Sequence, residues 1–96
     1  MRIPAHPGKI LKREIAARNM SANRLALDLG VPATRISEIL RGRRGITPET
    51  ALRLAAYFGG SPQFWMNMQT NHDIGLAQAE RGKEVERTVR AQPARA

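Results

Sequence analysis

Gly30 stands between two short segments that each carry apolar residues at helical spacing, and this feature limits the fold more than any other. Leu25 and Leu29 precede the glycine, and Ile36 and Ile39 follow it. Spacings of three or four residues place side chains on one face of a helix. Glycine adopts a positive φ without the strain that a Cβ imposes, so the backbone can turn sharply here. The pattern therefore predicts two short helices that meet at a steep angle.

This pairing of short helices is typical of a helix-turn-helix, in which the second helix enters the major groove of DNA. Small Ala26 allows the two helices to approach closely, and Val31 closes the space between them. We place the motif at residues 22–41 and its recognition helix at residues 33–41.

The outward face of the recognition helix carries the side chains that are expected to read DNA. A helical wheel places Thr34, Glu38 and Arg41 opposite buried Ile36, with Arg35 and Ser37 flanking them, and Ala33 lies near the start of the helix. Arginine pairs with guanine edges, glutamate accepts a hydrogen bond from cytosine, and a small apolar side chain contacts the thymine methyl group. The expected base-reading residues are Ala33, Thr34, Arg35, Ser37, Glu38 and Arg41. Glu38 could instead form an ion pair with Arg35 or Arg41 at i,i+3 spacing.

The formal net charge of +8 over 96 residues favours a polyanionic partner, with double-stranded DNA as the leading candidate. Basic residues are concentrated in residues 1–45 and 81–96, whereas every Phe, Tyr and Trp lies in residues 46–80. We therefore expect phosphates to meet the basic first half. Arg43 and Arg44, just after the recognition helix, are placed for phosphate contacts, which fix the protein on DNA without reading its sequence.

Helix signals dominate the rest of the chain, and no segment shows the strict alternation of a strand. A serine or threonine followed by proline, at residues 47–48 and 61–62, marks the starts of a fourth and a fifth helix. The fourth helix is expected to bury Leu52, and the fifth is expected to reach about Glu80. These features predict an all-α bundle of five helices.

The chain divides into one domain and a tail. We expect a DNA-binding and dimerisation domain at residues 1–80 and a basic, flexible tail at residues 81–96. The tail contains Pro93 and has only Val85 and Val89 as large apolar residues, so it offers little to bury. As a flexible arm it could also contact DNA phosphates.

Three blocks of the sequence resemble the HigA-type antitoxins, within the xenobiotic-response-element class of helix-turn-helix proteins. The blocks are HPGKIL, GVPATRISEILRGRRGIT and TPETALRLAAYFGGSPQFWMNMQTNHDIGLA, and they span roughly residues 4–80. The resemblance implies a λ-repressor-like five-helix bundle that dimerises, represses its own operon and neutralises an mRNA-cleaving toxin. Relatives of the wider class often have a phosphate-binding glutamine where Ala22 stands, so Asn23 or Arg24 would make that contact here.

The expected fifth helix carries a stripe of apolar and aromatic residues that could be core or interface. Aromatic residues and methionine are enriched in interface cores, so we expect part of the stripe to form the contact between two copies of the chain. The stripe consists of Phe64, Trp65, Met68, His72 and Leu76. Such a homodimer would read a palindromic operator with its two recognition helices about 34 Å apart.

The sequence gives no sign of catalysis, of a metal or cofactor site, or of a small-molecule substrate. It has no cysteine, and its two histidines, His6 and His72, lack a metal-ligand spacing. The longest apolar run, Leu54–Phe58, is far too short to span a membrane, so no membrane partner is expected. The lack of cysteine suits a reducing compartment, and we expect a cytoplasmic protein.

Two other functions stay open at this point. The chain could be a stand-alone regulator without a toxin partner. The Gly42–Gly45 segment is also a literal GXXG, as in KH domains that clamp single-stranded RNA, although KH domains need a three-stranded sheet.

Overall fold

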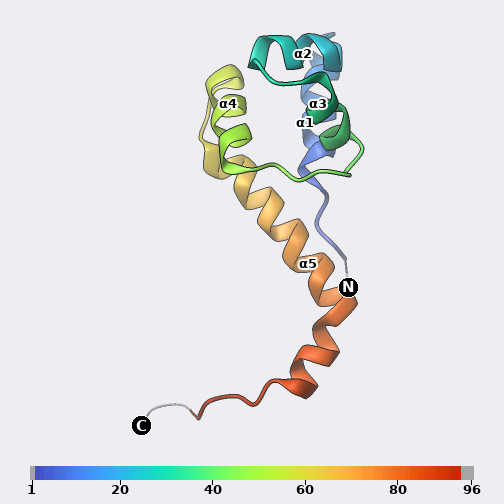
Figure 1. The fold of residues 1–96 in the computed structure, drawn as a ribbon, viewed down its shortest axis with the longest axis vertical. Helices are drawn as coiled ribbons and strands as arrows, with labels where there is room; N and C mark the ends of the chain where they lie inside the picture. The colour runs from blue at the N-terminus through green and yellow to red at the C-terminus, as the bar shows by residue number, and fades with distance from the viewer. Residues whose placement is uncertain (1, 94–96) are drawn as a thin grey trace.

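A computed structural model describes residues 2–93 of the chain, and this part of the chain is all-α. The helices are α1 (Pro7–Ala17), α2 (Ala22–Leu29), α3 (Ala33–Leu40), α4 (Pro48–Phe58) and α5 (Pro62–Thr88). Figure 1 shows α1 to α4 gathered at one end, while α5 starts beside α4 and extends away from them. Residues 2–93 contain no strand, so the sheet that a KH domain needs is absent from this part. The all-α bundle of five helices predicted from the sequence is confirmed in these residues.

Side-chain caps begin most of the helices where the sequence places them. The hydroxyl oxygen of Ser21 accepts a hydrogen bond from the backbone N–H of Arg24, 3.0 Å away. Thr47 and Ser61 cap α4 and α5 in the same way, each followed by proline. These bonds satisfy backbone donors that a helix start otherwise leaves unpaired.

The turn between α2 and α3 has the conformation that the sequence predicts. Gly30 ends α2 with φ 73° and ψ 35°, in the left-handed region. The N–H of Val31 then donates to the carbonyl of Ala26 at 3.0 Å, which closes the end of the helix. The chain can therefore enter α3 within a few residues.

One hydrophobic core joins all five helices. Leu11, Leu25, Ile36 and Leu54 are fully buried, and Trp65 of α5 is only 3% exposed. A buried polar contact lies at its edge, where the side-chain oxygen of Gln69 accepts a hydrogen bond from the backbone N–H of Ile46 at 2.7 Å.

Three sequence expectations about these helices are corrected. Leu52 is 59% exposed on α4 rather than buried. Recognition helix α3 ends at Leu40, with Arg41 as its C-cap. Helix α5 continues past Glu80 to Thr88, because a glycine inside a helix costs only about 1 kcal/mol and Gly82 does not stop it.

The longer α5 takes in part of the expected tail. Residues 81–88 are helical, with an ion pair of 2.7 Å between Arg81 and Glu84 on the helix surface. Residues 89–93 follow without helical structure, and the end of the expected tail, residues 94–96, lies outside the described residues. None of the helices among residues 2–93 is long and apolar enough to cross a membrane.

Gly75 has a packing role that the sequence alone does not show. A Cβ at this position would lie 2.7 Å from Cδ of Pro4, so a side chain here would collide with the N-terminal segment. His72, one turn earlier on α5, contacts the carbonyl oxygen of Pro4 through Nδ1 at 2.7 Å. The segment before α1 therefore lies against the middle of α5.

Candidate nucleic-acid interface

The polar face of α3 is open to solvent. Thr34 and Arg41 are exposed and Ser37 is half-buried, whereas Ile36 and Ile39 on the other side of the helix are fully buried. The core therefore holds α3 by one face and leaves the other face free to enter a groove. Ala33, at the start of the helix, is also exposed.

Glu38 forms an ion pair with Arg44 rather than with Arg35 or Arg41, the partners considered from spacing. The Arg44 guanidinium lies 2.7 Å from Oε1 of Glu38. The backbone N–H of Arg43 also donates to the carbonyl of Glu38 at 2.9 Å, so the loop after α3 folds back along the helix. Glu38, expected to read a base, and Arg44, expected to bind a phosphate, are therefore paired with each other.

Arg41 and Arg43 have no ion pair among residues 2–93. Both side chains are exposed at the C-terminal end of α3. Their charges are therefore available to an anion from outside the chain.

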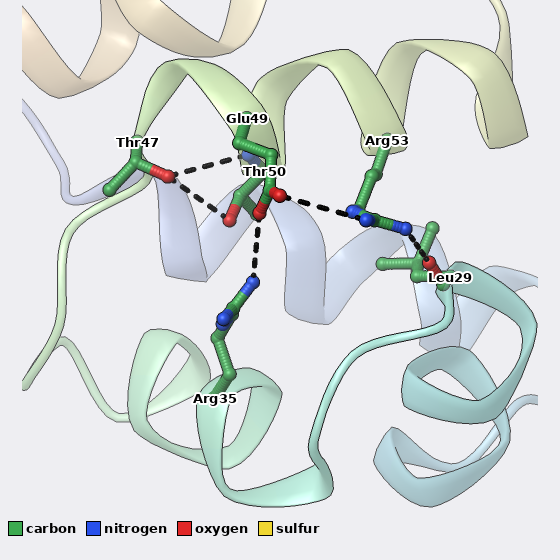
Figure 2. Close-up of polar contacts among 6 residues, drawn as sticks. All are labelled: Leu29, Arg35, Thr47, Glu49, Thr50 and Arg53. Atoms are coloured by element: carbon green, nitrogen blue, oxygen red, sulfur yellow. Dashed lines mark hydrogen bonds and ion pairs between the residues drawn. The ribbon is translucent and has the colours of Figure 1, made fainter.

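Arg35 is turned toward α4 instead of outward. Its guanidinium lies 3.2 Å from Oε1 of Glu49 in the first turn of α4, and its side chain is 29% exposed. Figure 2 shows Arg35 reaching from α3 up to this carboxylate. The helical wheel places Arg35 at the edge of the outward face. Its contact with α4 is tertiary, so spacing within α3 does not reveal it.

Glu49 also faces Arg53, one turn later on α4, at 3.6 Å. Arg53 in turn donates from Nη1 to the backbone carbonyl of Leu29, the last residue of α2, at 2.9 Å. A continuous row of polar contacts therefore runs from α3 through α4 to the end of α2 (Figure 2). Sequence reasoning missed this row, although the i,i+4 spacing of Glu49 and Arg53 was a signal for part of it.

The start of α2 carries the other two expected phosphate-binding residues. Asn23 and Arg24 are both exposed. Arg24 forms an ion pair of 3.2 Å with Asp28 on the same helix, and the Tyr57 hydroxyl of α4 donates to the same carboxylate at 2.7 Å. That hydrogen bond raises the pKa of the Tyr57 phenol, because it stabilises the protonated form.

The stripe on α5 is divided between the core and the surface. Trp65 is buried, Met68 is half-buried against the core, and His72 is held by Pro4. Phe64 and Leu76 are 52% and 38% exposed. These two residues are the members of the stripe with substantial surface to offer a second chain.

The structure brings His6 and His72 together, although they are far apart in the sequence. Their rings meet edge to face with centroids 5.1 Å apart. His6 caps α1, its Nδ1 accepting a hydrogen bond from the N–H of Gly8 at 2.9 Å. Burial and the neighbouring His72 lower the pKa of His6. Residues 2–93 hold no group of three potential metal ligands.

Comparison with known proteins finds relatives over most of this chain. The helix-turn-helix family HTH_3 matches residues 11–65. Virulence-associated protein I of Dichelobacter nodosus is 49% identical over 77 residues, which make up 79% of this chain and 71% of that protein.

Solved structures extend the similarity to nearly the whole chain. An addiction module antidote protein of a HigA family from Coxiella burnetii has a TM-score of 0.90 and 46% identity, over 95% of this chain and all of that one. The Pseudomonas aeruginosa antitoxin HigA, solved with the higBA promoter, has a TM-score of 0.89 and 38% identity. That match covers 94% of this chain and 99% of the other.

Proposed function

This chain belongs to the HigA family of helix-turn-helix DNA-binding proteins, and on that premise we propose that it is an antitoxin that represses its own operon as a homodimer. The family is one of non-enzymatic transcriptional regulators. The observation that carries the proposal is the exposed polar face of α3 opposite its buried isoleucines. The similarity to a HigA solved with promoter DNA supports it.

The proposed DNA contacts follow from exposure and charge. Side chains on the outward face of α3 read bases, and basic or polar side chains at the start of α2 and after α3 bind phosphates. The proposed base-reading residues are Ala33, Thr34, Ser37, Glu38 and Arg41. The proposed phosphate-binding residues are Asn23, Arg24, Arg43 and Arg44. Arg35 is not among them, because its side chain is turned toward α4 and is only 29% exposed. Glu38 and Arg44 pair with each other, but their side chains are 42% and 48% exposed.

We propose that the homodimer forms through α5. The support is the apolar surface that this helix exposes at Phe64 and Leu76, and also at Ile74 and Val85 in residues beyond the stripe. A two-fold axis through this contact gives a palindromic operator with half-sites one helical turn apart, about 34 Å.

The second proposed activity is neutralisation of an mRNA-cleaving toxin in the cytoplasm. The acidic side chains of residues 46–80 offer little free charge to a basic partner, because Glu49 pairs with two arginines and Asp73 accepts a hydrogen bond from Gln69. The toxin contact therefore depends more on apolar surface than on opposite charge.

Co-expression with the product of the adjacent gene tests the antitoxin proposal. Rescue of growth arrest and co-purification of the two proteins are the expected results. Binding of the purified chain to the DNA upstream of its own gene, compared with a scrambled duplex of equal length, tests repression. Operator binding without rescue would make the chain a stand-alone regulator. Preference for single-stranded RNA over duplex operator would contradict both.

A further inference from the structure

We propose that Glu49 is a positioning residue that fixes the orientation of recognition helix α3, and that Arg35 acts through Glu49 rather than on a base. The inference rests on the proposed DNA-binding function and deepens it. It assigns a role in operator selection to α4, which carries none of the proposed DNA contacts.

The capped start of α4 fixes the backbone position of Glu49. This residue lies in the first turn of α4, two residues after the Thr47 cap, whose hydroxyl oxygen faces the N–H and the hydroxyl of Thr50 (Figure 2). A carboxylate at a helix N-terminus is also favoured by the helix dipole. The cap and the dipole therefore fix the backbone at Glu49, and its carboxylate stands where another helix can be aligned against it.

Two arginines from different helices converge on this carboxylate. Arg35 reaches it from α3 at 3.2 Å with Oε1, and Arg53 faces Oε2 at 3.6 Å. Among the hydrogen bonds and ion pairs of the described residues, the pair of Arg35 and Glu49 is the one that joins α3 directly to α4. Its loss would remove the direct polar link between these two helices.

Arg53 extends the same row to the other helix of the motif. Its Nη1 donates to the carbonyl of Leu29 at 2.9 Å, and Leu29 directly precedes the Gly30 turn. Both helices of the motif are therefore tied to α4, α2 through its last carbonyl and α3 through Arg35. This arrangement fixes the angle at which the outward face of α3 meets a groove.

The row contributes to orientation more than to folding. The side chain of Glu49 is 62% exposed and that of Arg53 is 41% exposed, and exposed ion pairs contribute little to the free energy of unfolding. Base readout, in contrast, depends on side chains that reach the base edges in a defined geometry. A small change in the orientation of α3 is therefore expected to affect operator selection before it affects stability.

Glu49→Gln tests the proposal, because positioning and simple electrostatics predict opposite results. The substitution raises the net charge by one, so affinity for non-specific DNA should not fall. If Glu49 positions α3, the ratio of operator affinity to non-specific affinity should fall about tenfold. This is the loss of selectivity expected when one weak base contact is lost. An unchanged or higher ratio, as expected if a released Arg35 binds a base, would overturn the proposal.

Glu14→Gln is the matched control. Glu14 forms an exposed ion pair with Arg18 on α1, so its substitution removes an equivalent pair and the same charge away from α3. The operator-to-non-specific ratio should stay at the wild-type value. An equal loss in Glu14→Gln would show that the effect does not depend on the contact between Glu49 and α3, and it would count against positioning.

The double variant Arg35→Gln/Glu49→Gln locates the role of Arg35. If Arg35 acts through Glu49, the double variant loses no more selectivity than either single variant. If Arg35 contacts a base, the two losses add, and the second half of the proposal fails.

A measurement without DNA separates this proposal from the proposed function. Amide residual dipolar couplings report the orientation of α3 relative to α4, and they should change in Glu49→Gln but not in Glu14→Gln. Unchanged couplings in Glu49→Gln would overturn the positioning role. A wild-type chain that does not distinguish operator from other DNA would instead overturn the proposed function, while the couplings still decide the role of Glu49.

Discussion

The carbonyl oxygen of Ile39 lies 2.0 Å from the position that a Cβ on Gly8 would occupy. Gly8 belongs to the first turn of α1, and Ile39 is in the last turn of α3. The missing side chain therefore allows the start of α1 to pack directly against the backbone of the recognition helix. The position of the C-terminal end of α3 depends on this contact.

Gly8→Ala should destabilise the protein, because the clash is with backbone and cannot be relieved by a side-chain rotation. Overpacking of this kind costs about 1–3 kcal/mol. Urea unfolding of the purified variant measures the loss. Gly82→Ala is the control, since its Cβ would lie 3.9 Å from Cβ of Gln78, an ordinary van der Waals contact, and alanine there should stabilise the helix by up to about 1 kcal/mol. Equal stability of Gly8→Ala and the wild type would show that the position of α3 does not depend on close packing against Gly8.

Arg41→Ala should relax operator selection, because this exposed side chain lies at the end of the outward face of α3 without an ion pair among the described residues. Loss of a base contact costs about 1–3 kcal/mol against the operator and little against non-specific DNA. Fluorescence anisotropy with both duplexes measures the two affinities. Arg43→Ala, in the loop, should instead weaken both duplexes to a similar degree. The same uniform loss in Arg41→Ala would assign Arg41 to a phosphate.

The elements that could be predicted from the sequence are those with local causes. The Gly30 turn and the caps at Ser21, Thr47 and Ser61 depend on a few neighbouring residues, so the chain displays them directly. The end of α5 was placed too early, because Gly82 weakens a helix without ending it.

The contacts that could not be predicted join residues distant in the sequence. Arg35 meets Glu49 and Arg53 meets Leu29 only after α4 has packed beside the motif. A wheel drawn for α3 alone places Arg35 by its angle and contains no information on a carboxylate from another helix. The same reason explains why spacing does not indicate the partner of Glu38, because Arg44 comes within reach only when the loop folds back.

Operator affinity should fall steeply with salt. A dimer that makes about 6–10 phosphate contacts loses about 10³–10⁵ in affinity between 50 and 200 mM salt, because condensed counterions are released from DNA. Titrations at several salt concentrations give the slope. Arg43→Ala should lower that slope by about 2 per dimer, since it removes one phosphate contact from each chain. A nearly salt-independent affinity would contradict the phosphate contacts proposed for the basic residues beside α3.

Protein stability should decrease as the pH falls below about 6.5, because the pKa of His6 is lowered in the folded state from its ordinary value of 6.5. The unfolded chain then binds a proton that the folded chain resists, so protonation favours unfolding. The physical causes are burial and the facing His72 of α5, and the backbone of Arg44 and the Asp73 carboxylate oppose them. Protonation of Nδ1 would also remove the acceptor for the Gly8 N–H at the start of α1.

His6→Asn separates this effect from general acid sensitivity. Asparagine is a good N-cap residue, so the start of α1 keeps an acceptor that does not titrate. The free energy of unfolding, measured by urea at a series of pH values on both sides of 6.5, should fall less in His6→Asn than in the wild type. Parallel pH profiles for the two proteins would mean that His6 is not the group whose protonation destabilises the fold, and that the contact between the N-terminal segment and α5 is insensitive to its charge.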